Sequence, residues 1–172
     1  MPDEQTIATL AKAFMALRGR ACWSVLYGPS SGRVMQLQFE SKLPRAVPVE
    51  NDALTDDERM YDAEFVLYVS CAWRLDQATA VVCSSGDLER DAMESGRILD
   101  RVIGERVTAT QVRRPAGEVS LTLSGDYRLH LFCDEPAGYT NYSLLGPSVA
   151  YSVKALGRVF VEARQAFGPD NL

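Results

Sequence analysis

The chain has 172 residues, of which 47% are hydrophobic and 24% are charged, and its formal net charge is −5 at pH 7. This length suits a single domain that buries a core without help from disulfides or metals. The acidic balance argues against DNA or RNA as a partner, because phosphate binding needs a basic face. The sequence therefore predicts one domain, spanning 1–172, that does not bind nucleic acid.

The sequence predicts a cytoplasmic protein with neither a membrane span nor a secretory leader. No apolar run reaches the ~18 residues that a membrane span requires. Acidic residues stand at the start of the chain, where a signal peptide carries bases. No cysteine lies in a C-x-x-C pair, which argues against a zinc ribbon or a thioredoxin-like motif. In the cytoplasm the four cysteines are expected to be reduced thiols: Cys22, Cys71, Cys83 and Cys133.

The first predicted element is a helix over 3–18. Asp3 is placed to cap its start, and Gly19 is placed to end it in the left-handed conformation. Two strands are predicted next, over 21–28 and 33–40, with the turn sequence GPSSG between them. The apolar residues of the helix recur at spacings of three and four, which puts them on one face: Ile7, Leu10, Phe14 and Leu17.

Residues 41–62 interrupt the strand pattern with two prolines and a run of acidic residues. A loop of this length in a compact domain is unusual and is often functional or mobile. The sequence LTDDERM within it predicts one helical turn. Acidic side chains steer association with a basic protein. The candidate contacts to such a partner are Glu50, Asp52, Asp56, Asp57 and Glu58.

Residues 71–87, CAWRLDQATAVVCSSGD, are the densest cluster of distinctive residues. A tight connection at Asp76 and Gln77 is predicted to form a hairpin that builds the first sheet. A three-residue loop would place Cys71 opposite Cys83, whereas a two-residue loop would place it opposite Val82. Either register makes the thiols small core residues, with a redox pair as the alternative. Alternation from residue 63 to residue 75 predicts one strand with these residues on its core face: Phe65, Leu67, Val69, Cys71 and Trp73.

Three polar residues near this hairpin are candidates for a binding site. Arg74 points away from the core face. Asp87 is expected to cap a loop or the following helix, in preference to a catalytic role. His130, the only histidine, is expected on the exposed face of a strand. Catalysis by a nucleophile normally needs a base within hydrogen-bond reach, and pleat geometry excludes a dyad of His130 with Cys133. The sequence predicts no catalytic residue, no metal site and no cofactor.

The second half of the chain repeats the order of the first. A helix is predicted over 91–103, and Gly104 after it corresponds to Gly19, with Leu121 corresponding to Leu37. The sequence from Arg101 to Leu123 then predicts a helix end, Gly104, a strand, a turn and a second strand. Further strands are predicted over 127–134, 142–145 and 149–153, and the segment from residue 158 is expected to be a strand or a short helix. The predicted class is α+β with a mainly antiparallel sheet, built from two related helix-plus-β-meander halves over 3–85 and 91–154.

Several short motifs occur in an order that resembles a family of uncharacterised small bacterial cytosolic proteins. They are CAWRL followed by SSGDL, the strand pair from Gly117 to Gly125, the strand from Leu129 to Asp134, and the sequence from Asn141 to Leu144. The chain departs from this pattern in 41–62 and beyond residue 155. The resemblance implies an immunity-protein character and a bacterial toxin as the partner, and it carries over no catalytic residue.

The preferred interpretation is a non-enzymatic protein-binding module whose partner is a basic toxin that it neutralises. An enzyme or small-ligand-binding protein is the alternative. Its pocket would lie between the two sheet halves and would use Cys71, Arg74, Asp87 and His130 as polar residues. A third interpretation is a homo-oligomeric module that associates through unpaired edge strands.

Overall fold

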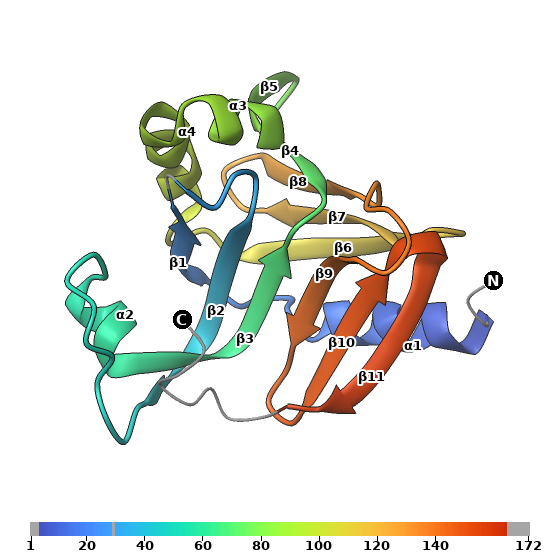
Figure 1. Ribbon diagram of the computed structural model, residues 1–172, viewed down its shortest axis with the longest axis horizontal. Coiled ribbons are helices and arrows are strands. Elements are labelled where there is room, and N and C mark those ends of the chain that lie inside the picture. The colour runs from blue at the N-terminus through green and yellow to red at the C-terminus, as the bar shows by residue number, and fades with distance from the viewer. Residues whose placement is uncertain (1–3, 29, 165–172) are drawn as a thin grey trace.

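A computed structural model describes residues 4–28 and 30–164 of the protein (Figure 1). The first half contains α1 (Glu4–Met15), β1 (Cys22–Tyr27), β2 (Met35–Pro44), α2 (Asp56–Met60), β3 (Tyr61–Val69), β4 (Ala72–Gln77) and β5 (Ala80–Ser84). The second half contains α3 (Ser85–Arg90), α4 (Ala92–Leu99), η1 (Asp100–Val102), β6 (Val107–Arg113), β7 (Glu118–Leu123), β8 (Tyr127–Phe132), β9 (Thr140–Leu145), β10 (Val149–Lys154), η2 (Ala155–Gly157) and β11 (Arg158–Ala163).

The strands form two antiparallel sheets that share one core. The six-stranded sheet has the order β1-β2-β3-β9-β10-β11, and the five-stranded sheet has the order β5-β4-β8-β7-β6. Every pair of neighbouring strands is antiparallel. The predicted α+β class with a mainly antiparallel sheet is confirmed. Within the described ranges, the helices are too short or too polar to cross a membrane.

Helix α1 packs its predicted apolar face into the core. Ile7, Leu10, Phe14 and Leu17 are all buried. Gly19 has the predicted left-handed backbone, with φ of 82°. Asp3, the predicted capping residue, lies outside the described residues. The helix ends at Met15, three residues before its predicted end, so Leu17 lies in the turn that follows. The hydrophobic spacing predicted the buried face correctly, and burial of that face holds the helix against the sheets.

The prediction of one continuous strand over 63–75 is wrong. The chain ends β3 at Val69 and begins β4 at Ala72, in the other sheet. The backbone N–H groups of Ser70 and Cys71 both donate to the carbonyl of Asn141 at 2.9 Å, and Ala72 N–H donates to Asp134. These bonds to the second half fix the change of sheet. The hairpin after it belongs to the five-stranded sheet, and not to the first sheet as predicted.

Both predicted registers of this hairpin are also wrong. Cys83 lies opposite Leu75, because β4 continues to Gln77 and the turn falls at Ala78, where φ is 51°. Cys71 lies before β4 begins. Both thiols are nevertheless buried, as expected of core residues. Burial also raises the pKa of both, which favours the protonated thiol over the reactive thiolate.

The second helical region starts earlier than the predicted 91–103 and is divided. Ser84 caps α3 and Asp91 caps α4, each by accepting from a backbone N–H three residues later. A 3-10 turn, η1, completes the region. Two capping residues seven positions apart each begin a new helix, which is why the segment is not one continuous helix.

Each half places its meander in one sheet and its next strands in the other. β1–β3 lie in the six-stranded sheet and β4–β5 in the five-stranded sheet, whereas β6–β8 lie in the five-stranded sheet and β9–β11 in the six-stranded sheet. Two strand pairs therefore join the halves within the sheets, β3 with β9 and β4 with β8.

The backbone around Gly19 and Gly104 relates the two halves by reciprocal hydrogen bonds. Gly19 N–H donates to the carbonyl of Val107 at 2.8 Å, and Gly104 N–H donates to the carbonyl of Cys22 at 2.7 Å. An isolated antiparallel bridge joins Ala21 with Arg106 between them. Both glycines have positive φ, 82° and 93°. The correspondence of these two glycines, predicted from the sequence, has this local geometry as its physical basis.

In each half, one buried aromatic residue of one sheet donates a hydrogen bond to a turn that leads into the other sheet. Trp73 of β4 donates from Nε1 to the carbonyl of Arg33 at 2.8 Å. Tyr142 of β9 donates from its hydroxyl to the carbonyl of Gly117 at 2.5 Å. Both side chains are fully buried. Each ring thus fills the core and also satisfies a carbonyl just before the second strand of a meander.

Candidate functional site

Two of the predicted site residues, Arg74 and His130, lie directly opposite each other on β4 and β8. Their face of the sheet is the one turned away from the core. His130 is only 9% exposed, so the prediction of an exposed histidine is wrong. The ring of Phe132 stacks at 6.3 Å, and the guanidinium of Arg74 lies 5.8 Å from the same ring. These long side chains cover the histidine on a face that alternation assigned to solvent.

A chain of hydrogen bonds runs across this face. Asp76 accepts two bonds from Arg74, at 2.8 and 3.0 Å, and its Oδ2 lies 3.1 Å from Nε2 of His130. Nδ1 of His130 lies 3.0 Å from Oγ of Ser120 on β7. Arg113 donates to the same Oγ. The series Arg74–Asp76–His130–Ser120–Arg113 joins four neighbouring strands and is called the polar row here.

The polar row has the residue types of a Ser-His-Asp triad, but its serine is less accessible to a substrate than a catalytic serine has to be. Ser120 is 6% exposed, and its hydroxyl is already engaged by both His130 and Arg113. A nucleophilic serine needs room for a substrate carbonyl and donors for the oxyanion. The contacts of Ser120 instead satisfy buried polar groups on the sheet. We therefore assign the polar row to the stability of the five-stranded sheet.

Asp76 and Ser120 were not predicted from the sequence, although alternation contained a signal for both. Asp76 is two residues from Arg74 on one strand, which puts both side chains on one face. The predicted SGD turn sets Ser120 opposite His130. The hairpin prediction places Asp76 in the turn, and for this reason Asp76 is not among the predicted site residues.

The two ionisable groups at the centre of the polar row have shifted pKa values. Burial lowers the pKa of His130, and the charges of Arg74 and Arg113 lower it further against the opposing effect of Asp76. Burial acts to raise the pKa of Asp76, but the hydrogen bonds and charge of Arg74 outweigh it and the net shift is downward. At neutral pH the row therefore holds a carboxylate beside a neutral imidazole.

The lowered pKa of His130 predicts a pH-dependent stability. The unfolded chain binds a proton near the ordinary histidine pKa of 6.5 and the folded chain binds it only at lower pH. The free energy of unfolding is therefore expected to decrease as the pH falls below about 6.5. Urea unfolding between pH 5 and 8 measures this, and His130→Gln is expected to flatten the dependence. A single-histidine NMR titration giving a pKa above 6.5 in the folded protein would contradict it.

Asp87 does not join Arg74 and His130. It occupies the third position of α3, where its carboxylate accepts from the backbone N–H of Ser84 at 2.9 Å while the Ser84 hydroxyl accepts from Asp87 N–H. Arg90 forms an ion pair with it at 3.0 Å. The capping role expected for Asp87 is the one the structure shows.

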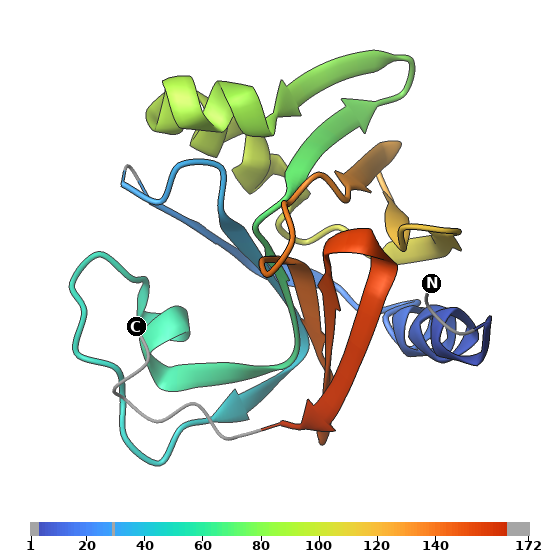
Figure 2. The ribbon, with the colours of Figure 1, turned by 45° about the vertical axis from the view of Figure 1, so that its right-hand side comes forward.

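The acidic segment forms an ordered arm, defined as residues 45–60. The strand pattern extends further than predicted, since β2 continues to Pro44 and β3 begins at Tyr61. The predicted helical turn is present as α2, with Thr55 and Glu58 forming a capping box. No residue of the arm is buried. Figure 1 and Figure 2 show the arm standing out from the ends of β2 and β3, away from the two-sheet body.

Backbone hydrogen bonds hold the arm in shape without a core of its own. Arg45 N–H donates to the carbonyl of Met60 at 2.9 Å, and Val49 N–H donates to the carbonyl of Arg59 at 3.0 Å. The Arg59 side chain returns a bond to the carbonyl of Val49 at 3.2 Å. Polar contacts thus close the arm upon itself without burying any of its residues.

The five predicted acidic contacts fall into two groups. Asp57 pairs with Lys42 at 2.5 Å, and Glu58 accepts from the hydroxyl of Ser24 at 2.5 Å, so both bind the arm to the sheet. Glu50, Asp52 and Asp56 are exposed. The exposed apolar side chains Val47 and Met60 accompany them, and Val47 is 73% exposed. The arm therefore presents three exposed acids, for which the described part of the chain provides no ion pair, together with two exposed apolar side chains.

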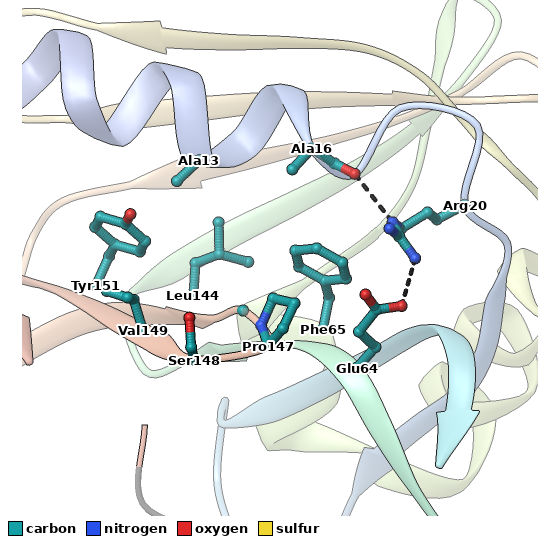
Figure 3. A pocket seen from close by; sticks show the side chains of 11 residues that line it. Ala13, Ala16, Arg20, Glu64, Phe65, Leu144, Pro147, Ser148, Val149 and Tyr151 are labelled. Carbon is teal, nitrogen blue, oxygen red and sulfur yellow. Dashed lines mark hydrogen bonds and ion pairs between the residues drawn. The ribbon is translucent and has the colours of Figure 1, made fainter. Parts of the chain in front are cut away.

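A separate pocket of about 310 Å³ lies between α1 and the turn from β9 to β10 (Figure 3). Both halves contribute to it, but none of the polar residues expected in an inter-half pocket does. Arg20 and Glu64 stand at one end and form an ion pair at 2.7 Å, with the Arg20 guanidinium 4.4 Å from the ring of Phe65. The remaining walls are largely apolar: Ala13, Ala16, Leu144, Gly146, Pro147, Ser148, Val149 and Tyr151.

The charged groups of this pocket are already paired, so it offers an apolar surface without a free charge. The Arg20 guanidinium also donates to the carbonyls of Ala16 and Glu40. Across 4–28 and 30–164, no group of three or more acidic, histidine or cysteine side chains is arranged to hold a metal ion. Comparison with protein-family models, curated proteins and solved structures finds no significant match to this chain.

Proposed function

We propose that the protein is a non-enzymatic protein-binding module that recognises a basic partner through its arm. The observation that carries this proposal is an ordered arm in which no residue is buried. An ordered segment with exposed side chains loses little conformational entropy on binding, because its shape is set beforehand. A partner surface would cover the exposed apolar residues Val47 and Met60 of this arm.

The composition of the arm indicates the chemistry of the partner. Protein interfaces combine an apolar centre with a polar rim. Within the arm, Val47 and Met60 provide exposed apolar surface, and Glu50, Asp52 and Asp56 provide exposed negative charge. Complementary charge accelerates encounter with a basic surface. A basic bacterial toxin in the cytoplasm, neutralised by occlusion of its active surface, is the partner class that we propose.

The contacts of the polar row and of the pocket favour binding over catalysis. Ser120 is covered and doubly hydrogen-bonded, and the charges of Arg20 and Glu64 are paired with each other. A catalytic group needs access to substrate. The exposed acids of the arm have no such pairing with any residue that the structure describes, and this contrast makes the arm the preferred binding site.

Charge reversal in the arm is expected to weaken partner binding. The double variant Glu50→Lys/Asp52→Lys is compared with Glu89→Lys/Glu94→Lys, which makes the same charge change at exposed positions of α3 and α4. The partner, expected to be the product of the adjacent gene, is first captured from the native host and then titrated with each variant at low salt. The binding affinity of the arm variant alone should fall by about tenfold or more, since steering charges act locally. Equal loss in both variants, or recovery of no partner from the host, would contradict the proposal.

A further inference from the structure

Strand β11 is one edge of the six-stranded sheet, and β1 is the other. Among the described residues β11 pairs with β10 alone, from Val149 opposite Ala163 to Lys154 opposite Arg158. Figure 1 shows it as the outermost strand, at the end of the molecule far from α2. Phe160 and Val161 are 48% and 53% exposed. An exposed apolar edge strand is a template for pairing, so we expect another strand to bind along β11.

The ladder between β10 and β11 determines which backbone groups face outward. Arg164 N–H donates to the carbonyl of Ser148 at 2.9 Å. Antiparallel pairs alternate between bonded and non-bonded, so Glu162, Phe160 and Arg158 direct their backbone groups toward β10. The N–H and C=O groups of Val159 and Val161 therefore point to the free edge. Any strand that pairs with β11 must bond to these two residues.

We propose that the occupant is β11 of a second copy, paired antiparallel about a two-fold axis at Phe160. In this register Val159 lies opposite Val161 of the second copy, and the outward backbone groups of the two valines form the bonded pairs. Phe160 meets Phe160 in a non-bonded pair, where side chains approach most closely. Arg158 lies opposite Glu162 on both sides of the axis. A two-fold interface needs such self-complementarity, and RVFVE provides it in both charge and shape.

The side chains support this register on both faces of the sheet. Arg158 and Glu162 are exposed, and within the described part of the chain neither has an ion pair that would have to be broken. Opposite-charge, aromatic and β-branched cross-strand pairs are each favourable. If the register between the two copies shifted by one residue, backbone groups that already bond to β10 would lie opposite the second copy and could not bond to it. If it shifted by two residues, Arg158 and Glu162 would no longer lie opposite each other.

The other three edge strands are less suited to a second copy. Helix α1 contacts both β6 and β11, and β1 lies beside α4, where Gly96 contacts the Tyr27 ring. What separates the strands is charge: β1 and β5 contain no charged residue, and β6 contains Arg113 alone. Of the four edge strands, only β11 has opposite charges placed symmetrically about an aromatic residue. The arm lies away from β11, so a dimer leaves both arms uncovered (Figure 1).

Charge exchange at Arg158 and Glu162 tests the register. A six-residue edge contact is smaller than a standard interface, so the wild type should shift with concentration toward twice its 19.0 kDa mass in sedimentation experiments. Arg158→Glu and Glu162→Arg each place like charges in both pairs and should weaken the dimer by about tenfold. An equimolar mixture of the two variants restores both pairs and should recover the dimer as a heterodimer.

A backbone variant provides a second readout. Val161→Pro removes an N–H that faces the free edge, while the bonds from β11 to β10 are retained, and it should abolish the dimer with little change in thermal unfolding. If this variant fails to fold, the Arg158→Glu and Glu162→Arg variants and their mixture still test the proposed dimer. A wild type that stays monomeric at millimolar concentration overturns the proposal. So does a dimer that is unaffected by the single charge variants, or a mixture that fails to restore it.

Discussion

Replacing Trp73 with alanine is expected to lower the free energy of unfolding by about 3–5 kcal/mol, the usual loss for a large buried aromatic residue. Trp73 is 1% exposed and lies at the centre of the core shared by the two sheets. Its Nε1 donates to the carbonyl of Arg33 at 2.8 Å, so the variant leaves both a cavity and an unpaired acceptor. Urea unfolding followed by circular dichroism measures the loss.

Trp23→Ala is the matched control, because it removes the same side chain from a partly exposed site. The indole N–H of Trp23 has no hydrogen-bond partner among the described residues, and its ring is covered by the ammonium of Lys42 at 5.2 Å. We expect this variant to lose about 1 kcal/mol, since it removes less buried area and breaks no hydrogen bond. Equal losses for the two variants would show that Trp73 does not have the central role assigned to it.

Asp76→Ala is expected to have the next largest effect, a loss of about 1.5–3 kcal/mol, the range for hydrogen bonds to a charged group. The change removes the acceptor of both Arg74 bonds and of the contact to Nε2 of His130. Because the charge of Asp76 raises the pKa of His130, its removal should lower that pKa further. Urea unfolding and NMR titration of the histidine report the two effects separately.

Asp87→Ala serves as the comparison for Asp76→Ala. It removes a carboxylate with a capping role, so it should cost about 1 kcal/mol and leave the pKa of His130 unchanged. A pKa of His130 that does not move in Asp76→Ala would contradict the electrostatic role given to Asp76, even if the variant were unstable.

The features that the sequence predicted correctly are those set by local periodicity. The face of α1, the burial of Trp73 and the thiols, and the helical turn in the arm all follow from spacing and capping within a few residues. The change of sheet after Val69 does not, because it depends on the carbonyl of Asn141, far along the chain. The alternating pattern continues unbroken through the crossing, so it contains no signal of the break.

The sequence predicted some residues of the candidate site but not the contacts between them. Arg74 and His130 do meet, but through Asp76, which was placed in a turn. The burial of His130 depends on Phe132 and Arg74, whose long side chains cover a face that alternation assigns to solvent. The acids of the arm were identified by composition alone. Composition cannot show that Asp57 and Glu58 are used internally.

The pairing of β3 with β9 and of β4 with β8 has a consequence for protein synthesis. The ribosome releases β4 and β5 well before β8, which pairs with β4 at the centre of the five-stranded sheet. Until residues 127–132 have emerged, β4 and β5 have no third strand to pair with, and their apolar face is uncovered. Successive domains fold one after another as they emerge. Here the two sheets each need strands from both halves, so we expect neither half to complete its sheets before the other has emerged.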